Sequence, residues 1–117
     1  MRTGEAQTVT DGKMLYCKIK GPTATGKRSP SGFVVFKDSQ AALWHRPSAK
    51  HIRKIREKLI NFGKLILRAG HLSFTSDIEF GIPSTAGGVI RGGNTNGFTQ
   101  WNNSKGRSLK EIEKGKL

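Results

Sequence analysis

Residues 79–101, EFGIPSTAGGVIRGGNTNGFTQW, are the stretch that decides the fold. Six of its twenty-three residues are glycine, and Pro83 precedes a short run of small and apolar residues. Proline in the first turn predicts a short helix over 83–90. Gly87 and Gly88 each destabilise such a helix by roughly 1 kcal/mol relative to alanine. We therefore expect this helix to pack closely against a sheet.

Residues 92–97, GGNTNG, supply positions that tolerate positive φ, since glycine lacks a Cβ and asparagine enters the left-handed region readily. We expect a tight turn at Asn96-Gly97. Bare backbone N–H groups in that turn are candidates for contact with a phosphate or a base, with Arg91 beside them. A purely structural connection is the alternative, and the two roles are compatible.

A strand is expected over 97–101, GFTQW, directly after this turn. Phe98 and Trp101 are three residues apart, so they would face opposite sides of the strand. One then belongs to the core, and the other is free to stack on a base. We assign Trp101 to the core.

An amphipathic helix is predicted over 48–63, SAKHIRKIREKLINFG. Ser48 stands at the N-cap position, and Gly63 stands where a C-terminal glycine belongs. One face carries an apolar stripe at helical spacing, which consists of Ile52, Ile55, Leu59 and Phe62.

The rest of the chain predicts short strands and turns. Apolar alternation and β-branched or aromatic runs predict strands over 14–20, 33–37 and 41–45 and a β-hairpin over 64–74. Turn residues fill 21–32, and Ser108 caps a helical turn over 108–114.

The fold class predicted from these elements is α+β. We expect a small single domain over 14–113, with a mostly antiparallel sheet, one main amphipathic helix and short C-terminal helices. Flexible tails are expected at 1–13 and 114–117.

The charge of the chain is its strongest functional signal. The 117 residues include 21 Lys and Arg against 8 Asp and Glu, a net charge of +13. Such an excess predicts a polyanionic partner, which is nucleic acid more often than an anionic membrane. No apolar run has the length of a spanning helix, the first residues lack a signal-peptide core, and Cys17 is the only cysteine. We expect no membrane association and a cytoplasmic location.

Two groups of cations, besides Arg91, are candidates for phosphate contact. The predicted helix carries Lys50, Arg53 and Lys54 opposite its apolar stripe, and a solvated helix surface is the alternative. Lys27 and Arg28 lie in the predicted basic loop 21–29.

That loop, GPTATGKRS, is close to a phosphate-binding loop, but it departs from the pattern at a critical position. Arg28 stands where the magnesium-binding Ser or Thr is required. Pro30 and Gly32 follow where a long helix should begin. We therefore expect a basic loop between two strands and no nucleotide hydrolysis.

Other catalytic chemistry has little support. The three histidines, His45, His51 and His71, are scattered and have no carboxylate or cysteine at metal-ligand spacing. On a strand, Asp77 and Glu79 would share one face and repel each other unless a cation lay between them. We expect them to be structural acids at the start of a helical turn. We predict no enzyme activity, no cofactor and no metal.

Residues 77–112, DIEFGIPSTAGGVIRGGNTNGFTQWNNSKGRSLKEI, resemble a bacterial and archaeal domain family of unassigned function. This family is often attached to GIY-YIG endonuclease domains or found near restriction–modification genes. The resemblance continues through TATGKRSPSGFVVFKDSQA and IREKLINFGKL, and it covers roughly residues 15–113. The tail is also similar to the restriction-enzyme adenine-methylase-associated (RAMA) module, which is thought to read DNA. The family has a serine at the position of Ile82, so a side-chain cap there is not expected.

The resemblance implies an accessory module, because the GIY and YIG segments of the nuclease are absent from this chain. We expect a non-catalytic nucleic-acid-binding domain of nuclease or restriction–modification systems, with DNA favoured over RNA. Lys27, Arg28, Lys50, Arg53, Lys54, Arg91 and Asn96 are the expected contact residues. A nuclease or methylase domain is a candidate partner. The alternative is an RNA- or ribosome-associated structural or protein-interaction module.

Overall fold

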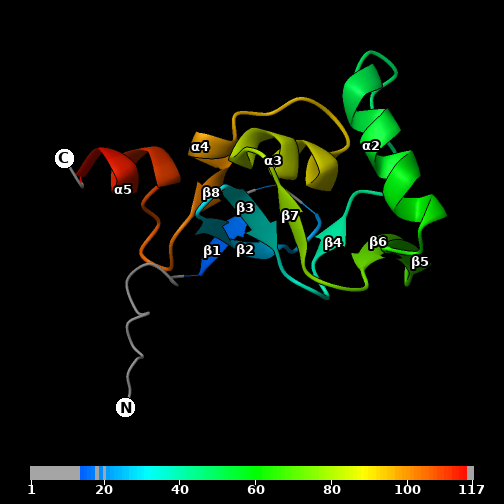
Figure 1. The fold of residues 1–117 in the computed structure, drawn as a ribbon, viewed down its shortest axis with the longest axis horizontal. Helices are drawn as coiled ribbons and strands as arrows, with labels where there is room; N and C mark the ends of the chain where they lie inside the picture. The colour runs from blue at the N-terminus through cyan, green and yellow to red at the C-terminus, as the bar shows by residue number, and fades with distance from the viewer. Residues whose placement is uncertain (1–13, 18, 20, 116–117) are drawn as a thin grey trace.

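The computed structural model describes residues 14–17, 19 and 21–115. Within these residues, eight strands form two antiparallel sheets, and four helices lie on one side of them (Figure 1). The α+β prediction is confirmed. The predicted tail at 1–13 lies outside the described residues.

The larger sheet has five strands in the order β7-β3-β2-β1-β8. Their bounds are β1 (Leu15–Cys17), β2 (Thr25–Ser29), β3 (Gly32–Val35), β7 (Ile78–Phe80) and β8 (Trp101–Asn102). The prediction of turns throughout 21–32 was therefore wrong for β2. That strand pairs with β1 on one side and β3 on the other, so ladder hydrogen bonds outweigh its weak strand propensity. Gly26 also fits closely there, because a Cβ would lie 2.4 Å from the Val34 carbonyl oxygen.

The smaller sheet has three strands in the order β4-β6-β5. They are β4 (Gln40–Ala41), β5 (Leu65–Arg68) and β6 (His71–Phe74). The predicted hairpin over 64–74 is confirmed, and its turn residues Ala69 and Gly70 have φ values of 52° and 85°. The predicted strand over 41–45 was wrong beyond Ala41, where the chain leaves the sheet.

Helix α2 (Lys50–Asn61) confirms the amphipathic helix, with differences at both ends. Gly63 follows it with φ +72°, as expected for a C-terminal glycine. The N-cap is Ala49, which has no side-chain cap hydrogen bond, so the Ser48 cap was wrong. Phe62 lies beyond the last helical residue and is 74% exposed, so it is not part of the buried stripe.

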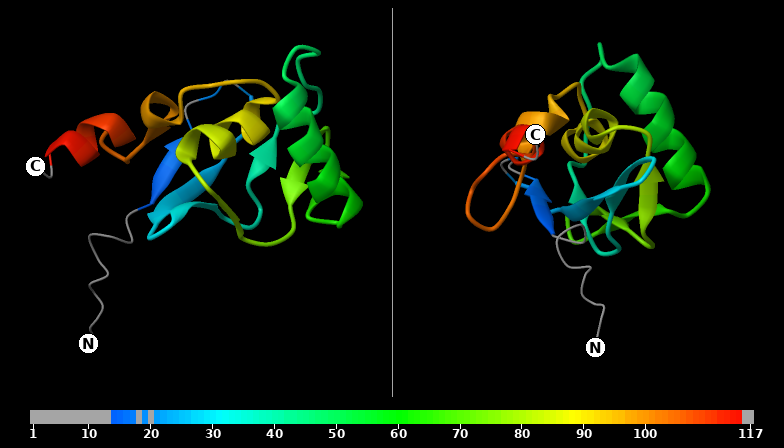
Figure 2. Two further views of the ribbon diagram at one scale, coloured as in Figure 1. Left: turned by 45° about the horizontal axis from the view of Figure 1, so that its top comes forward. Right: turned by 60° about the vertical axis from the view of Figure 1, so that its left-hand side comes forward.

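Helix α3 (Pro83–Arg91) is the centre of the packing. It contacts β3, β4 and β7 as well as α2 and α4 (Figures 1 and 2). Its apolar side chains, Ala86, Val89 and Ile90, are fully buried in the core. Ile82 is its N-cap and makes no side-chain cap hydrogen bond, as expected.

The close packing predicted at Gly87 and Gly88 is confirmed, but the neighbours are not a sheet. A Cβ at Gly87 would lie 2.8 Å from Thr95 Cγ2, and one at Gly88 would lie 2.6 Å from Ile52 Cδ1. These contacts come from the loop after α3 and from α2. The other residues of α3 pack against the sheets, and the two glycines leave space for this loop and for α2 to approach the helix backbone.

Residues 97–101 were wrongly predicted as a strand. Helix α4 (Gly97–Gln100) occupies most of this stretch, and only its end enters β8. Asn96 is the N-cap, and its Oδ1 accepts a hydrogen bond from the Phe98 N–H at 3.0 Å. The predicted tight turn at Asn96-Gly97 was wrong, because Gly97 is the first residue of α4 and does not have a positive φ. Gly97 is needed because a Cβ would lie 2.2 Å from the carbonyl carbon of Pro83.

Trp101 is a core residue, as predicted, with no exposed surface. Its ring centroid is 4.4 Å from that of Phe33, and its Nε1 donates to the Pro83 carbonyl oxygen at 3.2 Å. The indole thus joins the start of α3 to strand β3 of the five-stranded sheet.

Helix α5 (Leu109–Gly115) begins at a capping box. The Glu111 N–H donates to Ser108 Oγ at 3.2 Å, and the Ser108 N–H donates to the Glu111 carboxylate at 2.9 Å. The predicted Ser108 cap is confirmed, and buried Leu109 attaches the helix to the core.

The close contact at Gly97 gives a stability prediction. Gly97→Ala forces a Cβ against backbone atoms, and overpacking of this kind costs about 1–3 kcal/mol. Gly97→Ala should therefore lower Tm, because about 1 kcal/mol shifts the Tm of a domain of this size by about 4–8 °C. Gly81→Ala is the matched control, because Gly81 has open space around it and no positive φ. Thermal melting that changes equally in both variants would contradict the packing role of Gly97.

Candidate nucleic-acid interface

A groove of about 700 Å³ lies where five segments meet. They are the β1–β2 connection, residues 42–49, the β5–β6 turn and the facing ends of α3 and α4. We call residues 42–49 the Trp44 loop. The side chains that give the groove its chemistry are Leu43, Trp44, Arg46, His71, Arg91 and Gln100.

The groove combines exposed apolar surface with positive charge. Trp44 is 68% exposed and Leu43 is 52% exposed. Arg46 and Arg91 are both exposed, and none of the described residues that line the groove is acidic. An aromatic surface beside arginines suits a ligand that has both a flat ring and negative charge.

The Trp44 loop is held against the C-terminal end of α3 by its backbone. The Ala42 N–H donates to the Ile90 carbonyl, and the Arg46 N–H donates to the Gly92 carbonyl, each at 2.7 Å. Gly92 has φ +80°, and a Cβ there would lie 2.3 Å from the Trp44 carbonyl oxygen. Only glycine meets both conditions at that position. The glycine-rich stretch after α3 therefore exists partly to let the Trp44 loop approach.

The buried side chain of Arg56 also holds the Trp44 loop in place. This side chain is only 3% exposed, and its guanidinium donates to the Val89 carbonyl at 2.6 Å. It also donates to the carbonyls of Ala42 and Leu43. Burial lowers the pKa of Arg56, although a guanidinium stays protonated in proteins. Arg56 was not among the residues predicted from the sequence. The available signal was its position four residues after Ile52, on the apolar stripe of α2.

The predicted cations of α2 are close in sequence to the groove residue Arg46. Lys50 is the first residue of α2, four residues after Arg46, and both Lys50 and Lys54 are exposed. Arg53 forms an ion pair with Glu57 at 3.9 Å. The N-terminal turn of α2 has no acidic residue, so the helix dipole adds to the positive potential.

Three other predicted contact residues lie elsewhere. Arg28 forms an ion pair with Glu113 at 2.6 Å, and its guanidinium lies 5.5 Å from the Phe98 ring centre. Lys27 alternates with Arg28 on β2, so it lies on the sheet face away from α5. Asn96 caps α4. The structure thus brings Arg91 into the groove and groups Lys50, Arg53 and Lys54 on α2, but it brings no other predicted residue to them.

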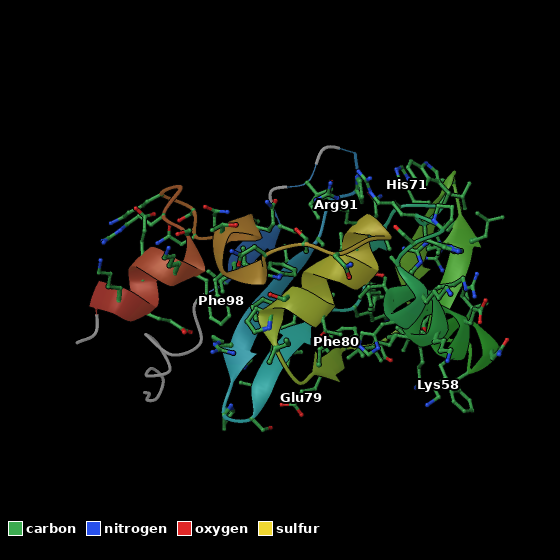
Figure 3. All side chains as sticks on the ribbon, turned by 90° about the horizontal axis from the view of Figure 1, so that it is seen from above. Lys58, His71, Glu79, Phe80, Arg91 and Phe98 are labelled. Carbon is green, nitrogen blue, oxygen red and sulfur yellow. The ribbon has the colours of Figure 1, made fainter. Side chains whose placement is uncertain are left out.

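The exposed aromatic expected from the sequence is Trp44 and not Phe98. Phe98 is partly buried against the core and lies near Arg28. Figure 3 shows Arg91 and His71 along one edge of the molecule, with Phe98 and Lys58 away from them. Trp44 was not predicted as a contact residue, because AALWH was predicted as a strand. No pattern in the neighbouring residues marks Trp44 as exposed.

Two acidic residues have structural partners. Glu79 accepts hydrogen bonds from the hydroxyls of Ser29 and Ser31, and these bonds hold its pKa below the usual range. Asp77 accepts from the Lys37 N–H at 2.8 Å. Their structural role is as predicted, although they support the sheet and not a helix start. Among the described residues, no three His, Cys, Asp or Glu side chains gather where a metal ion could bind.

A second hollow, of about 440 Å³, lies beside Tyr16, Cys17, Asn102 and Asn103. Burial raises the pKa of Cys17 to about 12. A thiol with so high a pKa is a poor nucleophile at neutral pH, because the thiolate is the reactive form. The hollow therefore offers little chemistry.

The comparison with known families now identifies the chain at the family level. The model of a domain of unknown function (DUF4357) matches residues 15–113. The chain belongs to the DUF4357 family. No curated protein and no solved structure matches this DUF4357 domain. In the described part of the domain, every helix is too short or too polar to cross a membrane.

Arg56 can be tested by its effect on stability. Arg56→Gln is expected to lower the free energy of unfolding by about 3 kcal/mol or more, since each buried carbonyl left without its donor costs about 1–3 kcal/mol. Arg53→Gln, with a side chain 41% exposed, is the control one helical turn away. Urea unfolding measures both. A destabilisation no larger in Arg56→Gln than in Arg53→Gln would contradict the anchoring role.

Cys17 should react slowly with iodoacetamide. Its folded pKa of about 12 compares with 9.0 for an ordinary thiol. At pH 8 the folded protein should react on the order of 100- to 1,000-fold more slowly than the urea-unfolded protein. Because the pKa of Cys17 is higher in the folded state, its protonated thiol stabilises the folded protein. This stabilisation is fully present below pH 9.0 and is lost as the pH rises toward about 12. Equal alkylation rates in the folded and unfolded protein would contradict a raised pKa of Cys17 in the folded state.

Proposed function

We propose that this DUF4357 domain binds nucleic acid without catalysing a reaction on it. The observation that carries the proposal is the groove, where exposed Trp44 lies with Arg46 and Arg91 and where none of the lining residues that the structure describes is acidic. The net charge of +13 supplies long-range attraction to a polyanion. Lys50 and Lys54 extend the interface along α2.

Arginine is well suited to this role. Its guanidinium forms paired hydrogen bonds with phosphate and also stacks on flat rings. Contacts of this kind fix the position of a nucleic-acid strand and carry no sequence information by themselves. Arg46 and Arg91 therefore support binding to many sequences.

The resemblance to the family attached to GIY-YIG nucleases and to the RAMA module favours DNA over RNA. In such an arrangement, this domain would deliver a nuclease or methylase domain to its substrate. Arg28 and Asn96 have partners inside the domain, so we leave them out of the proposed interface.

A protein-interaction function is the second candidate, and one observation favours it. Ile60, Phe62 and Leu67 are 44%, 74% and 67% exposed. They come from the end of α2 and from β5, which pack together. Apolar side chains exposed in this way are typical of a surface that another domain covers.

Salt dependence tests the electrostatic part of the proposal. Binding of a fluorescently labelled DNA oligonucleotide, measured by anisotropy, should weaken at least about tenfold between 50 and 200 mM salt, because each phosphate contact releases counterions. Arg46→Gln/Arg91→Gln should weaken binding and reduce the salt slope by up to about 0.9 for each phosphate that is no longer neutralised.

The control variant loses the same number of positive charges, but from another part of the surface. Lys105→Gln/Lys110→Gln removes the same two charges from exposed positions at the α5 end of the molecule. Equal weakening of binding in the two double variants would mean that net charge alone drives binding. An affinity that does not vary with salt would argue against phosphate contact altogether.

A further inference from the structure

We propose that Trp44 stacks on an unpaired base in the groove, so that the domain prefers single-stranded DNA to an intact duplex. This inference rests on the proposed function and deepens it. It names the form of nucleic acid that the groove accepts.

The two tryptophans of the chain have opposite environments. Trp101 is fully buried and belongs to the core, whereas Trp44 is 68% exposed. Trp101 and Phe33 already supply the aromatic side chains of the core between the five-stranded sheet and α3. Trp44 therefore contributes little to the interior, and its large flat face is available to a ligand.

The backbone that carries Trp44 is fixed. Hydrogen bonds at Ala42 and Arg46 attach both sides of the loop to α3, and Arg56 holds the carbonyls before Trp44. A side chain presented from a fixed backbone loses less conformational freedom on binding than one on a free loop. The arrangement is that of a preorganised stacking surface.

The surroundings of the indole match a nucleotide. A groove of about 700 Å³ is in the size range of small-molecule sites, which span about 300–1,000 Å³. Leu43 adds apolar surface, and the amide of Gln100 can both donate to and accept from a base edge. Arg46 and Arg91 supply positive charge for the adjoining phosphates.

Arg46 has a defined place in the groove. A Cβ at Gly93 would lie 3.0 Å from Arg46 Cδ, so the aliphatic part of the arginine packs on that glycine. This contact keeps the guanidinium at the groove, two residues from Trp44. Positive charge and aromatic surface are thus held together.

Base faces are hidden inside a duplex, where neighbouring pairs cover them. An aromatic side chain reaches a face only when the base leaves the stack. Every base has such a face, so stacking tolerates any sequence. Duplex DNA could still contact the arginines, but it would gain nothing from Trp44.

The test compares three labelled ligands of one length at one salt concentration: a single strand, its duplex, and a strand in which abasic sites replace the bases. The single strand should bind most tightly. Trp44→Ala should weaken single-strand binding about 5- to 150-fold, the range for removal of one stacked base. Trp44→Phe should retain most of the affinity, and neither variant should change duplex binding more than about twofold. Melting curves confirm that both variants fold.

Intrinsic fluorescence gives an independent readout. Single-stranded DNA should quench tryptophan emission in the wild type, and the quenching should disappear in Trp44→Phe, where buried Trp101 remains. Equal affinity for the normal and abasic strands, or quenching that persists in Trp44→Phe, would overturn the stacking proposal and leave phosphate binding intact. Failure of all three ligands to bind would overturn the proposed function as well.

Discussion

The hydrogen bonds of the buried Arg56 guanidinium are the interaction on which the rest of the structure depends. They join a carbonyl of α3, 33 residues later in the chain, to a carbonyl of the Trp44 loop, 14 residues earlier. A guanidinium can do this because its donors spread in a rigid plane, whereas a lysine has a single ammonium group. The side chain that supports the groove is thus a buried cation. Burial desolvates the charge of Arg56, whereas Arg46 and Arg91 at the groove are exposed to solvent.

Close approach is the second constraint, and it explains why α3 and its flanking loops contain so much glycine. Gly88 faces Ile52 of α2, Gly92 faces the Trp44 carbonyl, and Gly97 faces the backbone at Pro83. A methyl group at any of these positions would meet atoms within 2.6 Å. The helix is surrounded by the sheets, by α2 and by the loops at its own ends. The glycines lower helix propensity, and the tertiary packing that they permit offsets the loss.

Local signals in the sequence were sufficient for some elements and misleading for others. The stripe of α2, Pro83 at the start of α3 and the Ser108 cap act within a few residues, so they could be predicted. Strand β2 and helix α4 could not, because β2 forms through its two neighbours and Gly97 is selected by a contact 14 residues away in sequence. Among the proposed contacts, Arg91 and the lysines of α2 followed from charge, whereas Trp44 depends on how α3 and Arg56 hold its loop. An exposed aromatic cannot be told from a buried one by its neighbours in sequence alone.

The pairing of β1 with β8 has a consequence for how the protein is made. Cys17 lies opposite Trp101 at the sheet edge, so the first strand described finds one of its partners more than eighty residues later. During synthesis, β1, β2 and β3 leave the ribosome without the indole that packs on Phe33. Closing so long a loop is entropically costly, and such long-range contacts slow folding. The five-stranded sheet can therefore be completed only when almost the whole domain has been translated. Until then, the growing chain exposes an apolar sheet face that chaperones are suited to cover.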